Sequence, residues 1–165
     1  MGADEMKILG LIDTDLVNYK VSCLTIEMPY CSFKCDMECG RSICQNSALA
    51  SATKMDVSEE RVIDFYINNS PFSKAVCFQG LEPFDSYDDL LRFISKFRND
   101  YLIEDDIVIY TGYNKEEIAN QLAELSKFKN IVVKFGRFIP NQSPHFDEVL
   151  GVNLASDNQY AERIS

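Results

Sequence analysis

The sequence predicts a single α/β domain built on a mostly parallel sheet, and three observations carry that prediction. A length of 165 residues is typical of one domain. A hydrophobic content of 46% is enough for a core that needs no disulfides. Short β-branched runs alternate with segments of helical periodicity, which is typical of parallel strands joined by helical crossovers. We therefore expect one domain over residues 1–165.

The expected elements follow one another along the chain. Short apolar runs predict strands at 21–28, 74–78, 106–110 and 130–134, with a further strand at 148–154. Apolar residues at helical spacing predict helices at 58–68 and at 86–97, the second with Ser86 as its N-cap, and a third helix that begins at Asn114. Glu117, three residues after Asn114, gives this last helix the pattern of a capping box.

Unusual loops follow four of the predicted strands. They are the cysteine-rich segment after residue 28, Gly80 to Pro83, Thr111 to Tyr113, and Gly136 with Arg137. Turns from strand to helix favour glycine and polar residues in general, which explains any single loop but not the cysteines. Because the carboxyl ends of parallel strands meet at one edge, we expect these loops to form one site.

Charge and composition exclude several function classes. The chain has 26 acidic and 16 basic residues, a net charge of −10, which argues against binding to nucleic acid or to an anionic membrane. The first residues have no signal-peptide pattern, and no apolar run is long enough to span a bilayer, so we expect a cytoplasmic protein. The single histidine, His145, is expected in a loop without a catalytic role.

Four of the six cysteines lie between positions 31 and 44. In a reducing compartment such a cluster indicates ligands or catalytic thiols rather than disulfides. Only three residues separate Cys35 from Cys39, which is awkward for a tetrahedral zinc site, whereas an iron–sulfur cluster accepts close ligand spacing. A zinc site or a metal-free segment stays as the alternative. Cys23 and Cys77 fall inside predicted strands and are expected to be buried.

Cys31 and Cys35 form a C-x3-C pair, and Gly80-Leu81-Glu82-Pro83 follows a later strand. Together they resemble the radical S-adenosylmethionine (AdoMet) enzymes, whose signature is C-x3-C-x2-C after the first strand. The segment 42–46, Ser-Ile-Cys-Gln-Asn, is similar to the end of that signature, so the resemblance implies an insertion at 36–43. The implied [4Fe-4S] ligands are Cys31, Cys35 and Cys44, with Cys39 as the alternative third ligand.

The same resemblance implies an AdoMet site. Three cysteines leave one iron open, and in the family this iron binds the methionine end of AdoMet. The residues implied to bind AdoMet are Ile43, Gln45, Gly80, Leu81 and Glu82. Two of them depart from the family pattern, since Leu81 replaces a glycine and Gln45 replaces the usual histidine.

Three further motifs narrow the resemblance, namely Tyr-Thr-Gly-Tyr at 110–113, Gly-Arg-Phe-Ile at 136–139 and Ser-Asp-Asn-Gln at 156–159. In this order they resemble the activating proteins of anaerobic ribonucleoside-triphosphate reductase. The resemblance implies a partial (β/α) barrel that cleaves AdoMet reductively. The resulting 5′-deoxyadenosyl radical would take a hydrogen from a glycine of the partner, the large subunit of the reductase. A low-potential donor such as flavodoxin or ferredoxin would supply the electron.

Two other functions stay open. A radical AdoMet enzyme could act on a small molecule, for which Lys134, Arg137 and Asp157 offer polar groups. The chain could also be an iron–sulfur or zinc module that carries out no reaction. The Gly80 to Pro83 segment and the Tyr110 to Tyr113 loop argue against this last reading, because an electron carrier needs no AdoMet pocket.

Overall fold

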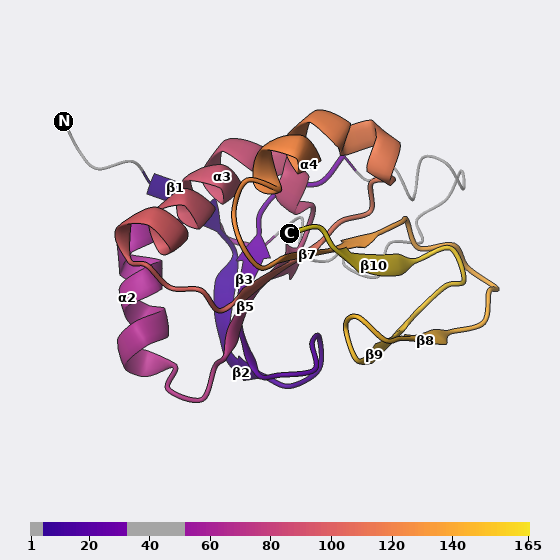
Figure 1. Ribbon diagram of the computed structural model, residues 1–165, viewed down its shortest axis with the longest axis horizontal. Helices are drawn as coiled ribbons and strands as arrows, with labels where there is room; N and C mark the ends of the chain where they lie inside the picture. Colours follow the sequence, from indigo (N-terminus) through magenta and orange to yellow (C-terminus); the bar gives the residue numbers. More distant parts are fainter. Residues whose placement is uncertain (1–4, 33–51) are drawn as a thin grey trace.

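A computed structural model describes residues 5–32 and 52–165. Its centre is a six-stranded sheet in the order β10-β7-β6-β5-β3-β2 (Figure 1). These strands are β2 (Gly10–Asp15), β3 (Cys23–Met28), β5 (Ala75–Gly80), β6 (Asp106–Tyr110), β7 (Ile131–Phe135) and β10 (Tyr160–Arg163). The four central strands β3, β5, β6 and β7 run parallel to one another. The edge strands β2 and β10 pair antiparallel with β3 and β7. The mostly parallel α/β fold predicted from the sequence is confirmed.

Two short antiparallel pairs lie outside this sheet. One joins β1 (Glu5–Ile8) to β4 (Met55–Ser58), and the other joins β8 (His145–Asp147) to β9 (Val152–Leu154). The expected strand at 148–154 is wrong in its first half, because residues 148–151 form the turn between β8 and β9. His145 is also placed differently from expectation, since it belongs to strand β8 rather than to a loop.

The helices form the crossovers between the parallel strands and lie on the same side of the sheet (Figure 1). They are α2 (Glu59–Asn69), α3 (Tyr87–Ser95) and α4 (Ala119–Leu125). The chain enters α3 and α4 through the 3₁₀ turns η2 (Pro83–Ser86) and η4 (Lys115–Ile118), and leaves α3 through the π-helical turn η3 (Lys96–Asp100).

Of the two predicted helix caps, one is confirmed and one differs. Ser58 accepts a hydrogen bond from the Arg61 amide at 3.2 Å and so begins α2. The capping box of Asn114 and Glu117 is confirmed. Ser86 does precede α3, but its side chain makes no capping hydrogen bond, because η2 already continues into the helix.

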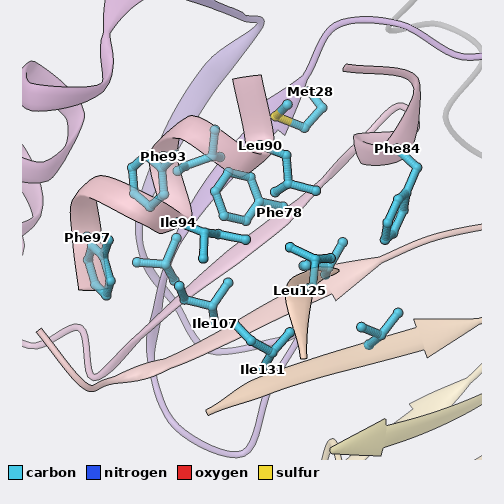
Figure 2. Close-up of a cluster of buried hydrophobic side chains, with 14 of the residues drawn as sticks. Met28, Phe78, Phe84, Leu90, Phe93, Ile94, Phe97, Ile107, Leu125 and Ile131 are labelled. Carbon is cyan, nitrogen blue, oxygen red and sulfur yellow. The ribbon is translucent and has the colours of Figure 1, made fainter. Parts of the chain in front are cut away.

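The main core lies between the helices and one face of the sheet (Figure 2). Phe78 of β5 packs edge-on against Phe93 of α3, with 5.1 Å between the ring centroids, and Phe93 stacks on Phe97. Ile107 and Ile131 close this layer from the neighbouring strands. The apolar helix faces expected from the sequence are therefore the buried faces, as the hydrophobic effect requires.

The opposite face of the sheet carries a second, smaller core. Cys23 and Cys77 are fully buried there, together with Tyr19, Val108 and Leu150. Burial raises the pKa of the Cys23 thiol to about 12 and that of Cys77 well above its usual value. Both thiols therefore stay protonated, and the expectation that they are buried core residues is confirmed.

Among the described residues, none of the helices combines the length and the apolar character that crossing a bilayer requires.

Candidate functional site

A cavity of about 440 Å³ opens at the carboxyl ends of the parallel strands. Its volume falls in the range of about 300–1,000 Å³ that small-molecule sites occupy. All four unusual loops contribute to its wall, through Cys31, through Gly80 to Glu82, through Thr111 and Gly112, and through Gly136. The expectation that these loops meet at one site is therefore confirmed.

The floor of the cavity is a row of polar side chains across four strands. Glu27 of β3 pairs in register with Gln79 of β5, and Tyr110 of β6 pairs with Lys134 of β7. All four residues line the cavity. Lys134 is 6% exposed, and its Nζ donates a hydrogen bond of 3.1 Å to the Gly136 carbonyl. The row therefore offers an acidic group at one end and a buried cation at the other.

Glu82 joins two of the loops. Its Oε2 accepts hydrogen bonds from the Thr111 hydroxyl at 2.9 Å and the Phe84 amide at 3.0 Å, and its Oε1 accepts one from the Gly112 amide at 2.8 Å. Burial raises the pKa of this carboxyl to about 7, and the three hydrogen bonds oppose the rise. Glu82 is extended (φ −91°, ψ 110°), because the ring of Pro83 disfavours a helical conformation of the residue before it.

Gly80 allows the end of β5 to lie close to the backbone of β3. It has a φ of +87°, which residues with a Cβ rarely adopt, and a Cβ built on it would lie 3.0 Å from the Met28 amide nitrogen. Leu81, where the family pattern has a second glycine, is buried and donates its amide hydrogen to the Met28 carbonyl at 3.1 Å. The loop is thus fastened to the strand that leads into the cysteine-rich segment.

The Ser-Asp-Asn-Gln motif holds the loop after β7. The Gln159 side chain accepts hydrogen bonds from the Ala155 and Ser156 amides, both at 3.1 Å. The Asn158 side-chain amide donates to the Arg137 carbonyl at 2.8 Å. Two motifs that are separate in the sequence are therefore one structural unit in which Gln159 lines the cavity.

Arg137 and Asp157 do not line the cavity. The Arg137 guanidinium pairs with Glu117 at 2.7 Å and lies over the Tyr113 ring, 5.8 Å from its centroid. Asp157 is exposed, and its amide donates to the Gln142 side chain at 2.8 Å. Of the three polar residues considered for a small substrate, only Lys134 lies in the cavity.

One wall of the cavity was not predicted from the sequence. Val17 and Asn18 form part of it, and residues 152–155 of the β8–β9 hairpin and its exit lie there too. Asp15 holds the first of these segments by accepting hydrogen bonds from the Val17 amide at 2.8 Å and the Asn18 side chain at 2.6 Å. The contact from the Val17 amide, two residues after Asp15, is an Asx turn, and an aspartate at this position is the local signal that could have indicated this segment.

Cys31 is half-buried and lies in the wall of the cavity. The other expected ligands Cys35 and Cys44, the alternative ligand Cys39, and the AdoMet residues Ile43 and Gln45 all lie outside the described residues. Within 5–32 and 52–165, no three His, Cys, Asp or Glu side chains form a group that could hold a metal ion. The described thiol fits a ligand by its chemistry and its place beside the Gly80 to Glu82 loop.

An α/β domain with a polar cavity at its carboxyl-terminal strand ends and a cysteine at the cavity wall defines a class of cofactor-binding domains. The chain belongs to the 4Fe-4S single cluster domain family, whose model matches residues 23–159. It is a 4Fe-4S domain of the radical AdoMet type. Searches of curated proteins and of solved structures found no match.

Proposed function

We propose that this protein is a radical AdoMet activase that generates a glycyl radical on the large subunit of an anaerobic ribonucleotide reductase. The observation that carries the proposal is the cavity in which Cys31, Glu82 and Gly136 meet, each from a loop that follows a different parallel strand. The Cys31 and Glu82 loops carry motifs that resemble those of radical AdoMet enzymes, and Gly136 begins one of the three motifs by which the sequence resembles the activating proteins.

In this proposal Cys31, Cys35 and Cys44 bind the [4Fe-4S] cluster, and Cys39 is the alternative to Cys44. When bound, the cluster supplies one electron for cleavage of the sulfur–C5′ bond of AdoMet. The products are methionine and a 5′-deoxyadenosyl radical, which takes one hydrogen atom from the α-carbon of the partner's glycine. A flavodoxin or ferredoxin is the proposed electron donor.

Glu82 fits a role at the methionine end of AdoMet. Among the described residues, its Oε1 accepts one hydrogen bond, from the Gly112 amide, which leaves a lone pair for a further donor. A ligand ammonium beside this buried carboxyl would favour its ionised form, because opposite charges lower the pKa of an acid. Lys134 supplies the positive charge that a ligand carboxylate needs.

The test is anaerobic reconstitution with iron and sulfide, followed by reduction and incubation with AdoMet. The proposal expects 5′-deoxyadenosine, and a glycyl-radical signal when the reductase is present. A reconstituted cluster without AdoMet cleavage would contradict the enzyme assignment. Cleavage without a glycyl radical would contradict the partner.

Paired variants test the third ligand. Cys44→Ala should prevent cluster assembly, whereas Cys39→Ala should retain the cluster. The reverse result would assign Cys39 as the ligand. Cys23→Ala is the matched control, because this thiol is buried in the second core, away from the cavity lining.

A second candidate is a radical AdoMet enzyme that acts on a small molecule. The observation that favours it is the polar row of Glu27, Gln79, Tyr110 and Lys134 on the cavity floor, which could bind a polar substrate beside AdoMet. Cleavage of AdoMet that is stimulated by a small polar compound rather than by the reductase would support this candidate.

A further inference from the structure

The short segment between β5 and α3 holds the backbone on both sides of Cys31. Before this cysteine, the Tyr30 carbonyl accepts a hydrogen bond of 2.7 Å from the Glu82 amide. After it, the Ser32 amide donates a hydrogen bond of 2.9 Å to Asp85 Oδ2. Cys31 therefore lies between two backbone groups that are fixed by residues only three positions apart.

Asp85 makes a second contact that fixes its own position. Its Oδ1 accepts a hydrogen bond of 2.6 Å from the Tyr113 hydroxyl, so each carboxylate oxygen has a different partner. Burial and the hydrogen bond to Asp85 raise the pKa of Tyr113 to about 12. A hydrogen bond with the Ser32 side chain opposes this rise. Ser32, Asp85 and Tyr113 are thus linked pairwise.

This group of three residues connects three loops of the site. Ser32 follows β3, Asp85 lies in η2 after β5, and Tyr113 follows β6. A carboxylate that accepts hydrogen bonds from an amide and a hydroxyl makes two charge-assisted contacts, which are stronger than neutral ones. A ligand held by such outer partners keeps its orientation, and removal of these partners typically weakens metal binding 10–100-fold.

We propose that Asp85 is a positioning residue for the cluster: with Tyr113, it fixes the backbone at Ser32 and so orients the Cys31 thiol toward the cavity. This inference rests on the proposed function in so far as Cys31 is a cluster ligand. Asp85 needs no contact with the cluster or with AdoMet for this role, because it acts through the Ser32 amide.

The first test uses the full chain without iron. Asp85→Ala should speed hydrogen exchange at the Ser32 amide by about tenfold or more, because the carboxylate that accepts this hydrogen is lost. Asp85→Asn keeps one acceptor oxygen and should restore part of the protection. Asp88→Asn is the control, since Asp88 is exposed at the start of α3. Unchanged exchange at Ser32 in Asp85→Ala would overturn the proposal.

The second test uses the reconstituted protein and a chelator. Cluster loss should be about 10–100-fold faster in Asp85→Ala, intermediate in Asp85→Asn and Tyr113→Phe, and unchanged in Asp88→Asn. Exchange at the core amide of Val108 should stay at the wild-type rate, which separates local positioning from general destabilisation. Equal cluster loss in Asp85→Ala and wild type would overturn the proposal, as would an equally large increase in exchange at Val108.

The two proposals fail in different ways. A wild-type protein that holds its cluster but does not cleave AdoMet contradicts the proposed function and leaves the positioning of Cys31 intact. Normal AdoMet cleavage and normal cluster retention in Asp85→Ala contradict the positioning role and leave the proposed function intact.

Discussion

The Thr111 hydroxyl donates a hydrogen bond of 2.9 Å to Glu82 Oε2, and this contact joins the loops that follow the adjacent strands β5 and β6. Both side chains are buried, with Thr111 1% and Glu82 7% exposed. The same hydroxyl accepts a hydrogen bond from the Tyr113 amide at 3.0 Å. Thr111 is therefore the link between the carboxylate of the Gly80 to Pro83 segment and the backbone of the Tyr110 to Tyr113 loop.

Thr111→Val should lower the free energy of unfolding by about 1.5–3 kcal/mol, because a buried carboxyl loses one donor and an amide loses its acceptor. Chemical denaturation of the iron-free chain measures this change. Thr53→Val is the control, since Thr53 is exposed and its substitution should change stability by less than about 0.5 kcal/mol. Equal effects of the two substitutions would contradict the role of Thr111.

Glu82 should make stability depend on pH. Its pKa in the folded protein is about 7, above the ordinary 4.5, so the folded state binds this proton more tightly than the unfolded state. The contribution is complete below about pH 4.5 and is lost as the pH rises to about 7. Glu82→Gln should remove this loss, which amounts to about 3 kcal/mol at most.

The measurement for Glu82 is the free energy of unfolding at several pH values for the wild-type and Glu82→Gln chains. The difference between the two curves isolates the Glu82 carboxyl from the other acidic groups. A difference that stays constant between pH 4.5 and 7 would show that the pKa of Glu82 is not raised.

Gly80→Ala should destabilise the fold by roughly 2–4 kcal/mol. Its φ of +87° disfavours a residue with a Cβ, and the new methyl group would lie 3.0–3.1 Å from backbone atoms of Met28 and Glu27. Gly112→Ala is the matched control in the same cavity, because its nearest neighbours would lie at 3.7 Å. Thermal unfolding of both variants checks the prediction, which fails if Gly112→Ala is equally destabilising.

Gln159→Leu should lower stability by roughly 2–3 kcal/mol, because the Ala155 and Ser156 amides lose the oxygen that accepts both of their hydrogen bonds. Gln142→Leu removes a single acceptor at an exposed amide and should have a smaller effect, about 1 kcal/mol or less. Denaturant titrations of the two variants make the comparison. A larger loss in Gln142→Leu would contradict the bracing role of Gln159.

The parallel strands could be recognised from the sequence because strands that are covered on both faces are continuous apolar runs. The runs at 106–110 and 130–134 coincide with β6 and β7 to within one residue at each end. The capping box at Asn114 is also local, since its two residues are three positions apart. The order of the motifs after each strand was enough to place the cavity at the carboxyl ends.

Strands β1, β4 and β10 were missed because each is short and carries charged residues, so none has an apolar run. Each forms only by pairing with a strand that is distant in the sequence, as Glu5 of β1 pairs with Ser58 of β4. Strand β2 was missed for a similar reason, because an edge strand with exposed positions does not need a continuous apolar sequence.

The sequence by itself predicted which loops line the cavity, because the cysteines, the Gly80 to Pro83 segment and the order of the strands can be read directly along the chain. The tertiary structure decided what holds those loops. Glu82 and Thr111 are 29 positions apart, and Ser32 and Asp85 are 53 apart. Such contacts depend on the register of the parallel strands and on the path of each crossover, which no local pattern specifies.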